Sequence, residues 1–414
     1  MNIQPSSPLS IVLLLVLCFA SSYKISPFQS VFNKINLQNK QVSKSSIIQS
    51  THILLHSNNH HKSTIWVAGE VLIDLIPNDP GINKNRQAIV GGSGANVAKA
   101  AAQLGLNSVF LASLSTDKYG LIATKHLEAS NVNLKYANVC DKSTCLAIVS
   151  LDKSGSASYE FLIDGTATFD FSPAWLPSPR LTPTTQISSS SVSISDSTRN
   201  DNVLLTQNSN SPNPSLLLVG SLVTVIEPAA SELYTWISSL PSHLPIIFDP
   251  NIRPAVIPDK QFYRLAVENW IKVSSVVKAS DEDLHAIYPH EDDQSIVEKW
   301  FQLSSRLELI VFTRGADGIV AYTRSGIRST VPAVGVDVVD TIGAGDTVSA
   351  ILCDALVQFG LHNICHNNNG SSSVSADDLL LTRVLRRAAR AAAICCSRAG
   401  AVPPSAEELS GYPY

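Results

Sequence analysis

The chain of 414 residues is poor in aromatic and charged side chains, and it has no apolar run long enough to cross a membrane. Phe, Trp and Tyr make up only 7% of the residues, and no basic stripe carries interleaved rings, which argues against nucleic-acid binding. The formal net charge of −4 gives no indication of a polyanionic partner. Hydrophobic residues reach 44%, enough for the core of one large domain.

Paired cysteine motifs are also missing. The seven cysteines are an odd number in a long chain, and no C-x-x-C pair is present. The pattern predicts reduced thiols and neither a disulfide framework nor a zinc site. Cys140 and Cys145 are close enough in sequence to pair across a turn, but unpaired thiols are favoured.

Acidic residues are absent before Glu70. The short apolar run at 11–20 is typical of a signal-peptide core, and the Lys- and Ser-rich stretch that follows has a transit-peptide composition. Residues 1–64 therefore resemble a bipartite leader for import into a plastid bounded by extra membranes, with no membrane attachment after its removal. Secretion and a cytoplasmic location are the alternatives.

The segment around residues 338–347, V-V-D-T-I-G-A-G-D-T, predicts a strand, a tight turn and a helix. Val334, Val336 and Val338 alternate as in a half-buried strand, and apolar residues recur at helical spacing beyond the turn. Glycines allow close approach of a ligand, and the helix start offers unpaired N–H groups, so the turn predicts an anion site. Asp346 at its centre is suited to take a proton from a hydroxyl that attacks phosphorus, whereas a helix N-cap is the simpler alternative. No Lys-Ser/Thr pair follows the glycines, which excludes a P-loop.

The sequence D-T-I-G-A-G-D at 340–346 resembles the signature of the ribokinase-like (PfkB) sugar kinases. This resemblance implies that Asp346 is the catalytic base and that the amides of Gly343, Ala344 and Gly345 form the anion hole. It also implies an α/β fold, a three-layer sandwich with a mostly parallel central sheet and a small β lid. Short apolar runs separated by helix-length segments agree with such a sheet; they lie at 216–219, 246–248, 275–277 and 309–313.

The first residues of the predicted domain contain an isolated acid among apolar neighbours. Residues 65–69 and 71–76 predict a buried strand that runs on into an edge segment, where Asp74 needs polar partners. Sugar hydroxyls would serve. The sequence G-E-V-L-I-D at 69–74 is similar to the first strand of fructokinases, whose Asp binds the sugar.

The sequence G-G-S-G-A-N-V-A at 91–98 precedes an alanine-rich helix and resembles the N-terminal signature of the same family. The resemblance implies substrate contacts from Gly91, Gly92 and Asn96. Alternating runs at 145–150 and 158–163 predict a hairpin, which in the family belongs to the lid. The following D-G-T-A is similar to a G-T-A-D segment of bacterial fructokinase-like proteins, but Thr168 replaces the Asp. This difference leaves the identity of the sugar open.

Several loops resemble the nucleotide-binding elements of the family. D-P-N-I-R at 249–253 places an amide and Arg253 where a transferring phosphoryl group would need them, although a salt-bridged surface turn fits this piece equally well. Asp283 in K-A-S-D-E-D stands where the family has an acid that organises magnesium through water, and a helix cap is the alternative. The ATP-binding residues implied by these loops, by T-R-G-A-D-G and by R-A-G-A near the end are Asn251, Lys278, Ser280, Thr313, Gly315, Gly318, Ala399 and Gly400.

Two stretches interrupt the predicted kinase domain at 65–414. Residues 180–215 and 362–375 are rich in Ser, Asn, Thr or Pro and predict low-complexity insertions. A helix at 381–397 follows the second stretch.

The sequence thus predicts an ATP- and Mg²⁺-dependent kinase for a primary hydroxyl of a small sugar, first of all fructose to fructose 6-phosphate. Ribose, 2-keto-3-deoxygluconate or a nucleoside are alternative acceptors. A non-catalytic plastid fructokinase-like scaffold is an alternative of another class. Asp340 is predicted to lie near a monovalent-cation site such as one for K⁺, and the family suggests a homodimer through the lid.

Overall fold

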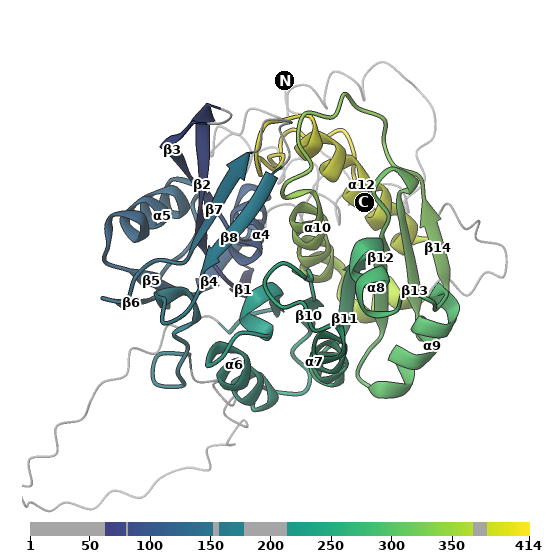
Figure 1. Cartoon of the computed structure of the whole chain (residues 1–414). Helices are drawn as coiled ribbons and strands as arrows, with labels where there is room; N and C mark the ends of the chain where they lie inside the picture. The colour runs from purple at the N-terminus through teal and green to yellow at the C-terminus, as the bar shows by residue number, and fades with distance from the viewer. Residues whose placement is uncertain (1–62, 80–81, 152–156, 178–212, 367–378) are drawn as a thin grey trace, which may run out of the picture. The chain divides into compact units, whose positions relative to one another are not determined.

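The structure is a computed structural model that describes residues 63–79, 82–151, 157–177, 213–366 and 379–414 (Figure 1). The predicted leader up to residue 62 lies outside the described residues. The same holds for most of the predicted insertions at 180–215 and 362–375.

The main sheet has eight strands in the order β14-β13-β12-β11-β10-β9-β1-β4. All neighbours from β4 to β12 are parallel, and β13 and β14 add an antiparallel edge. Each predicted apolar run of 216–313 forms one parallel strand. The strands are β1 (Thr64–Ala68), β4 (Asn107–Leu111), β9 (Leu216–Gly220), β10 (Ile246–Asp249), β11 (Val276–Ser280), β12 (Leu309–Thr313), β13 (Ile319–Thr323) and β14 (Arg328–Val331).

Helices cover both faces of this sheet, which explains why its strands are apolar on both sides. Along β1, Ile65 and Val67 pack into one core, while Trp66 and Ala68 pack into the other. The first core includes α4 (Ser93–Gln103), α10 (Ala344–Phe359) and α12 (Leu380–Cys396); the second includes α6 (Ala229–Ser238), α7 (Lys260–Val273) and α9 (Asp293–Leu303). The remaining helices are α5 (Lys118–Ala129), α8 (Asp281–Ile287) and α11 (Leu361–Cys365). The predicted three-layer α/β sandwich is therefore confirmed (Figure 1).

A second, smaller sheet has the order β3-β2-β7-β8 and is called the small sheet below. Its strands are β2 (Leu72–Asp79), β3 (Ile82–Gly91), β7 (Leu146–Leu151) and β8 (Ala157–Leu162); two short strands, β5 (Ser113–Ser115) and β6 (Asn138–Cys140), pair separately. The predicted hairpin is confirmed by the antiparallel pair β7 and β8. The prediction of an edge segment after β1 is wrong, because β2 lies between β3 and β7 and belongs to a different sheet from β1.

The predicted strand through Val334, Val336 and Val338 is also wrong. The segment follows the edge strand β14 but has no strand partner, and Val338 is 64% exposed. Its backbone is held instead by the carbonyl of Cys396, which accepts hydrogen bonds from the N–H groups of Val339 and Asp340. Alternation alone therefore does not make a strand where no sheet edge is available.

The start of the predicted insertion at 362–375 is helical. Residues Leu361–Cys365 form α11, in which Ile364 and Cys365 are buried in the first core. The long predicted helix at 381–397 is confirmed as α12, within one residue at each end.

The described cysteines, from Cys140 onward, are all free thiols, as predicted. Within the part of the chain that the structure describes, no helix is long and apolar enough to span a bilayer.

The start of α4 is pressed against the end of β1. A Cβ atom added at Gly94 would lie 2.5 Å from the Cα of Gly69, and one added at Gly69 would lie 2.6 Å from the Cα of Gly94. Contacts this short leave room for glycine alone at both positions, so the helix and the strand touch through their backbones.

We predict that Gly94→Ala lowers the free energy of unfolding by about 1–3 kcal/mol, because an overpacked backbone contact must open. Chemical denaturation of the wild type and the variant measures this. Gly335→Ala is the control, because no atom lies within 4 Å of a Cβ added there. Equal stability of the two variants would contradict the close packing of Gly69 and Gly94.

Candidate active site

Asp346 lies in the first turn of α10 and is 8% exposed. Its carboxylate accepts two hydrogen bonds, from Ser93 Oγ to Oδ1 at 2.6 Å and from Asn96 Nδ2 to Oδ2 at 2.9 Å. Both donors belong to the first turn of α4. The predicted base and the predicted substrate-binding amide of Asn96 are thus brought into direct contact.

The glycine turn before Asp346 has the conformation that an anion site requires. Gly343 is the N-cap of α10 with φ 79°, a left-handed conformation, and a Cβ there would lie 2.6 Å from the Cβ of Ala401. The first-turn N–H groups of α10 have no acceptor within the helix. The amide of Ala344 donates to Thr341 O at a long 3.3 Å.

A buried cation lies directly beneath this turn. Lys278 Nζ is 3.0 Å from Asp249 Oδ2 and would be 2.9 Å from a Cβ on Gly345. Burial opposes the charged form, but the carboxylates of Asp249, Asp283 and Asp346 prevail and raise the pKa of Lys278. The ammonium is therefore charged at neutral pH. Lys278, predicted as an ATP-binding residue, is 4% exposed and lies under the turn.

The loop with Asn251 and Arg253 is fixed by Asp283. Asp283 Oδ1 accepts the N–H of Ile252 at 2.6 Å, and Oδ2 accepts both the N–H and the hydroxyl of Ser280 at 2.8 Å. Ser280 in return caps α8 in a capping box, so the interpretation of these two residues as a helix cap is confirmed. The side chain of Arg253 is exposed.

Asp340 joins the glycine turn to the segment after α12. Its Oδ1 accepts the N–H of Ile342 at 3.0 Å, and its Oδ2 accepts the N–H of Gly400 at 2.8 Å. Asp340 and Gly400 were predicted for different ligands, a monovalent cation and ATP. They touch each other, so the two predicted sites lie side by side.

The predicted nucleotide loop follows β12. Thr313 pairs in register with Ser280, and the loop closes through a hydrogen bond from Arg314 N to Gly318 O at 2.8 Å. An ion pair with Asp293 holds the side chain of Arg314. No hydrogen bond among the described residues joins Gly315 or Gly318 to Ala399 or Gly400.

Asp74 lies on β2 of the small sheet. Its Oδ2 occupies the space that a side chain on Gly91 would need, 2.3 Å from an added Cβ. Ile89, Ala147 and Phe161 continue its row across the sheet, since Asp74 pairs with Ile89 and Ala147, and Ala147 pairs with Phe161. Burial raises the pKa of the Asp74 carboxyl from 3.8 to about 6.

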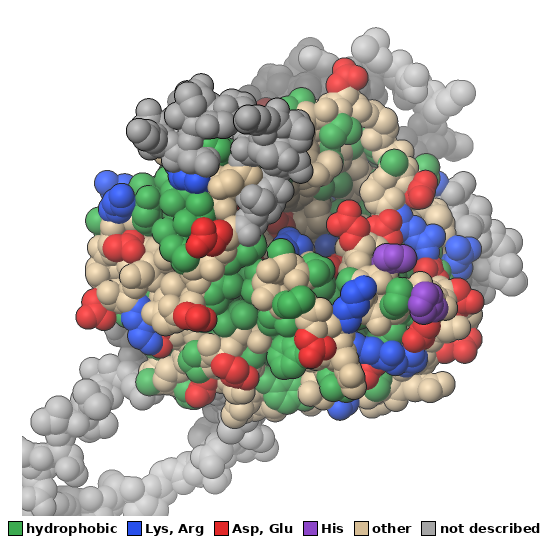
Figure 2. All heavy atoms as spheres, viewed as in Figure 1, with side chains coloured by type: hydrophobic (Ala, Val, Ile, Leu, Met, Phe, Trp, Pro, Cys, Tyr) green, Lys and Arg blue, Asp and Glu red, His purple; other side chains and the backbone are tan. Residues whose placement is uncertain are grey.

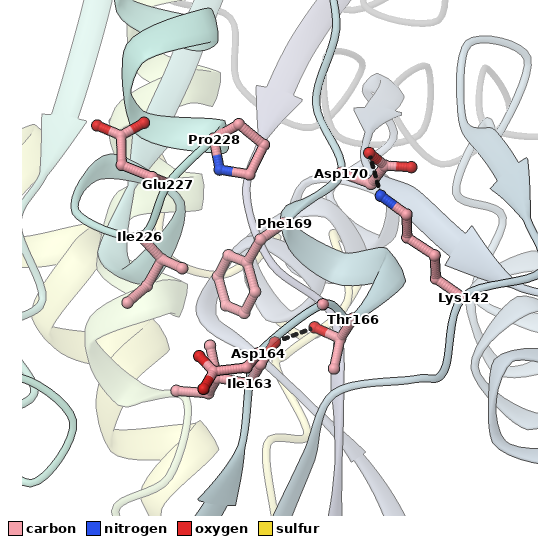
Figure 3. Close-up of a pocket in the computed structure, with 10 residues that line it drawn as sticks. Lys142, Ile163, Asp164, Thr166, Phe169, Asp170, Ile226, Glu227 and Pro228 are labelled. Carbon is pink, nitrogen blue, oxygen red and sulfur yellow. Dashed lines mark hydrogen bonds and ion pairs between the residues drawn. The ribbon is translucent and has the colours of Figure 1, made fainter.

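Two adjoining cavities lie at the end of β8. The larger, about 270 Å³, is lined by Phe161, Ile163, Asp164, Ile226, Ala255 and Val256. The smaller, about 90 Å³, shares three of these residues and is enclosed further by Phe169 and Pro228, with the Lys142–Asp170 ion pair at its rim (Figure 3). Figure 2 shows a hollow beside the small sheet with basic and acidic side chains inside it.

Thr168, which stands where the resemblance requires Asp, does not face these cavities. It is 2% exposed, and its hydroxyl donates to the carbonyl of Val71 at 2.8 Å. The residue therefore fastens its segment to the connection between β1 and β2.

The sequence did not single out several residues that complete the site. Glu70 accepts the N–H of Ser93 at the start of α4, and the hydroxyl of Ser93 donates to Asp346. Asp249 accepts hydrogen bonds from both Lys278 and Ser349. Asp249 could have been found from its place at the carboxyl end of a parallel strand. Ser93 is one hydroxyl in a glycine-rich run, and no sequence pattern indicates its contact with Asp346.

A buried carboxylate at a helix start, beside a glycine turn at the carboxyl ends of parallel strands, defines an α/β enzyme of phosphoryl transfer. The family model described as pfkB family carbohydrate kinase matches residues 62–213 and 184–408, and the chain therefore belongs to the pfkB family of carbohydrate kinases. It is an ATP-dependent carbohydrate kinase, as predicted.

Individual relatives agree with this assignment. A fructokinase of Rhizobium leguminosarum bv. trifolii is 30% identical over 287 residues, covering 69% of this chain and 77% of that protein. "Probable fructokinase-6, chloroplastic" of Arabidopsis thaliana is 25% identical over 298 residues, covering 70% and 69%. The crystal structure of a fructokinase with bound ATP from Xylella fastidiosa has a TM-score of 0.66 at 22% identity over 84% of this chain and 97% of that one, which confirms the ribokinase-like fold.

We predict that Asp74→Asn raises the melting temperature at pH 7.5 and loses this gain at pH 4. The pKa of Asp74 is about 6 in the folded chain and 3.8 in the unfolded chain. Between pH 3.8 and pH 6 the folded chain therefore keeps a proton on Asp74 that the unfolded chain has released. Its contribution to stability is therefore present below pH 3.8 and is lost as the pH rises through 6. Thermal unfolding at both pH values measures the effect, with the exposed Asp337→Asn as control. A gain that is equal at pH 4 and pH 7.5 would refute the burial argument.

Proposed function

We propose that the chain transfers the γ-phosphoryl group of ATP to a primary hydroxyl of a small sugar, most directly from fructose to fructose 6-phosphate. One observation carries this proposal. Asp346, at the start of α10, is buried and held through both carboxylate oxygens by Ser93 and Asn96. A scaffold protein has no need of a base fixed beside an anion site, so this arrangement favours catalysis over the scaffold alternative.

In the proposed mechanism the hydroxyl oxygen of the sugar attacks the γ-phosphorus of ATP in line while Asp346 takes the proton of that hydroxyl. The bond from the γ-phosphorus to the bridging oxygen breaks, and ADP leaves. Charge on the phosphoryl oxygens is stabilised by the amides of Gly343, Ala344 and Gly345 and by Arg253. Lys278 adds a positive charge beneath the turn. This charge makes the amides of the turn better hydrogen-bond donors to an anion. A side chain at Gly345 would displace this ammonium, since an added Cβ would lie 2.9 Å from Lys278 Nζ.

The residues near Asp283 fit a magnesium ion held through water. Three donors already reach its carboxylate, from Ile252 and twice from Ser280. A carboxylate has about four acceptor positions, so one remains for a water molecule, and none is available for a cage of direct protein ligands. Bound magnesium would neutralise charge on the ATP phosphates. A monovalent cation such as K⁺ near Asp340 is part of the same proposal.

The acceptor is proposed to bind between Asp74, Gly91 and Gly92 on one side and Asn96 on the other. The row from Asp74 to Phe161 leads to the larger cavity and would offer the sugar both polar and apolar side chains. The small sheet would exclude water from the reaction. The name of the Rhizobium relative supports fructose. Ribose, 2-keto-3-deoxygluconate and nucleosides are the competing acceptors.

The leader at 1–64 is proposed to direct the enzyme to a plastid. Its composition supports this, as does the chloroplastic name of the Arabidopsis relative. Secretion and a cytoplasmic location are the competing destinations. A homodimer through the small sheet is proposed from the family resemblance alone.

We predict that Asp346→Asn abolishes sugar phosphorylation, with a loss of at least about 100-fold, and leaves ATP affinity nearly unchanged. The amide keeps the shape of the carboxylate but cannot accept the proton. Calorimetric ATP titration and coupled kinetics measure the two quantities. Retention of more than about a tenth of the activity would refute the base assignment.

The function itself is tested by ATP consumption with Mg²⁺ across fructose, ribose, glucose, 2-keto-3-deoxygluconate and adenosine. Turnover with fructose far above the other acceptors is the expected result. Turnover with another compound of this panel would replace the substrate and keep the kinase. ATP binding without turnover on any acceptor would favour the scaffold.

A further inference from the structure

Among the described residues, Ser93 donates the shorter of the two side-chain hydrogen bonds that Asp346 accepts. Its hydroxyl donates to Oδ1 at 2.6 Å, while Asn96 donates to Oδ2 at 2.9 Å. The two donors stand three residues apart in one helix, so they face the same side of α4. Each donates a hydrogen bond to a different oxygen of the carboxylate.

Two hydrogen bonds to different oxygens fix the orientation of a carboxylate, whereas one does not. The terminal torsion of an aspartate side chain is broad, so a single hydrogen bond lets the carboxylate plane rotate. Bonds to both oxygens fix this plane. About four acceptor positions exist on a carboxylate, so two remain in a fixed direction for the proton of the acceptor hydroxyl.

The main chain of Ser93 is itself held in place by Glu70. The N–H of Ser93 donates to Glu70 Oε1 at 2.9 Å, and the N–H of Ala95 donates to the main-chain oxygen of Glu70 at 3.2 Å. Glu70 is only 2% exposed, and the backbone contact between Gly69 and Gly94 fixes the same turn. The connection between β1 and β2 therefore determines the position of Ser93.

The other groups that face Asp346 cannot replace this contact. Lys99, Lys278 and Asp249 interact with Asp346 through charge alone, whereas Cys395 is a neutral thiol, because burial raises its pKa. None of the four donates a hydrogen bond to Asp346 among the described residues. The orientation of the carboxylate thus depends on the two donors of α4.

We propose that Ser93 is a positioning residue for the base: supported by Glu70, its hydroxyl holds the carboxylate of Asp346 in the orientation that receives the acceptor's proton. The inference rests on the proposed function of Asp346. It assigns to the third residue of G-G-S-G-A-N a role in turnover, while the glycines and Asn96 serve the acceptor.

The test compares the full chain with Ser93→Ala and Ser93→Thr, with ATP, Mg²⁺ and the best acceptor of the panel. We expect Ser93→Ala to lower kcat about tenfold, the loss typical of one hydrogen bond to a charged group, and to leave both KM values within about twofold. Ser93→Thr, which keeps the hydroxyl, restores kcat to within about threefold of the wild type. The control is Ser108→Ala, a buried serine whose hydroxyl has no partner among the described residues and which is expected to be silent.

Each outcome decides the proposal. A kcat of Ser93→Ala within twofold of the wild type overturns it, as does a loss that appears only as a raised KM, since that would make Ser93 a substrate contact. A loss of kcat that threonine fails to restore, at an unchanged melting temperature, also overturns it. Failure of the proposed function looks different: the wild type itself then consumes no ATP with any acceptor, and the inference falls with it.

Discussion

The hydrogen bonds from Ser93 and Asn96 to Asp346 connect residues 253 and 250 positions apart. Through them the first turns of α4 and α10 meet at one carboxylate, which lies in the positive field of two helix starts. The start of α4, the glycine turn and Asp346 are consequently one unit, and a change in the packing of either helix start reaches all three.

Acidic side chains fix every loop around this unit. Asp283 holds the loop of Asn251 and Arg253, Asp340 holds the turn to Gly400, and Asp249 holds Lys278 beneath the glycines. The carboxylates of Asp283 and Asp249 satisfy the N–H of Ile252 and the ammonium of Lys278, which would otherwise be buried without these partners. The loops at the strand ends are therefore positioned by polar contacts, while the layers behind them are positioned by apolar packing.

The sequence predicted the layers well, because the apolar periods of β9 to β12, α4, α10 and α12 are local signals. It failed at 334–338, where the alternation was real but no strand was available for pairing, and at the start of 362–375, where burial of Ile364 and Cys365 outweighs a polar composition. Family motifs predicted Asp346, Asn96 and Asp283 as candidate site residues. They did not lead to Glu70 or Ser93, since a contact between distant segments leaves no pattern in either segment.

The separation between the two sheets has a further consequence. Asp74 belongs to the small sheet, whereas Asn96 and Asp346 belong to helices on the main sheet. In the proposed complex a sugar that touches all three would join the two sheets non-covalently. Such an acceptor would stabilise the small sheet more than ATP would, because a ligand stabilises the part of the fold that it contacts.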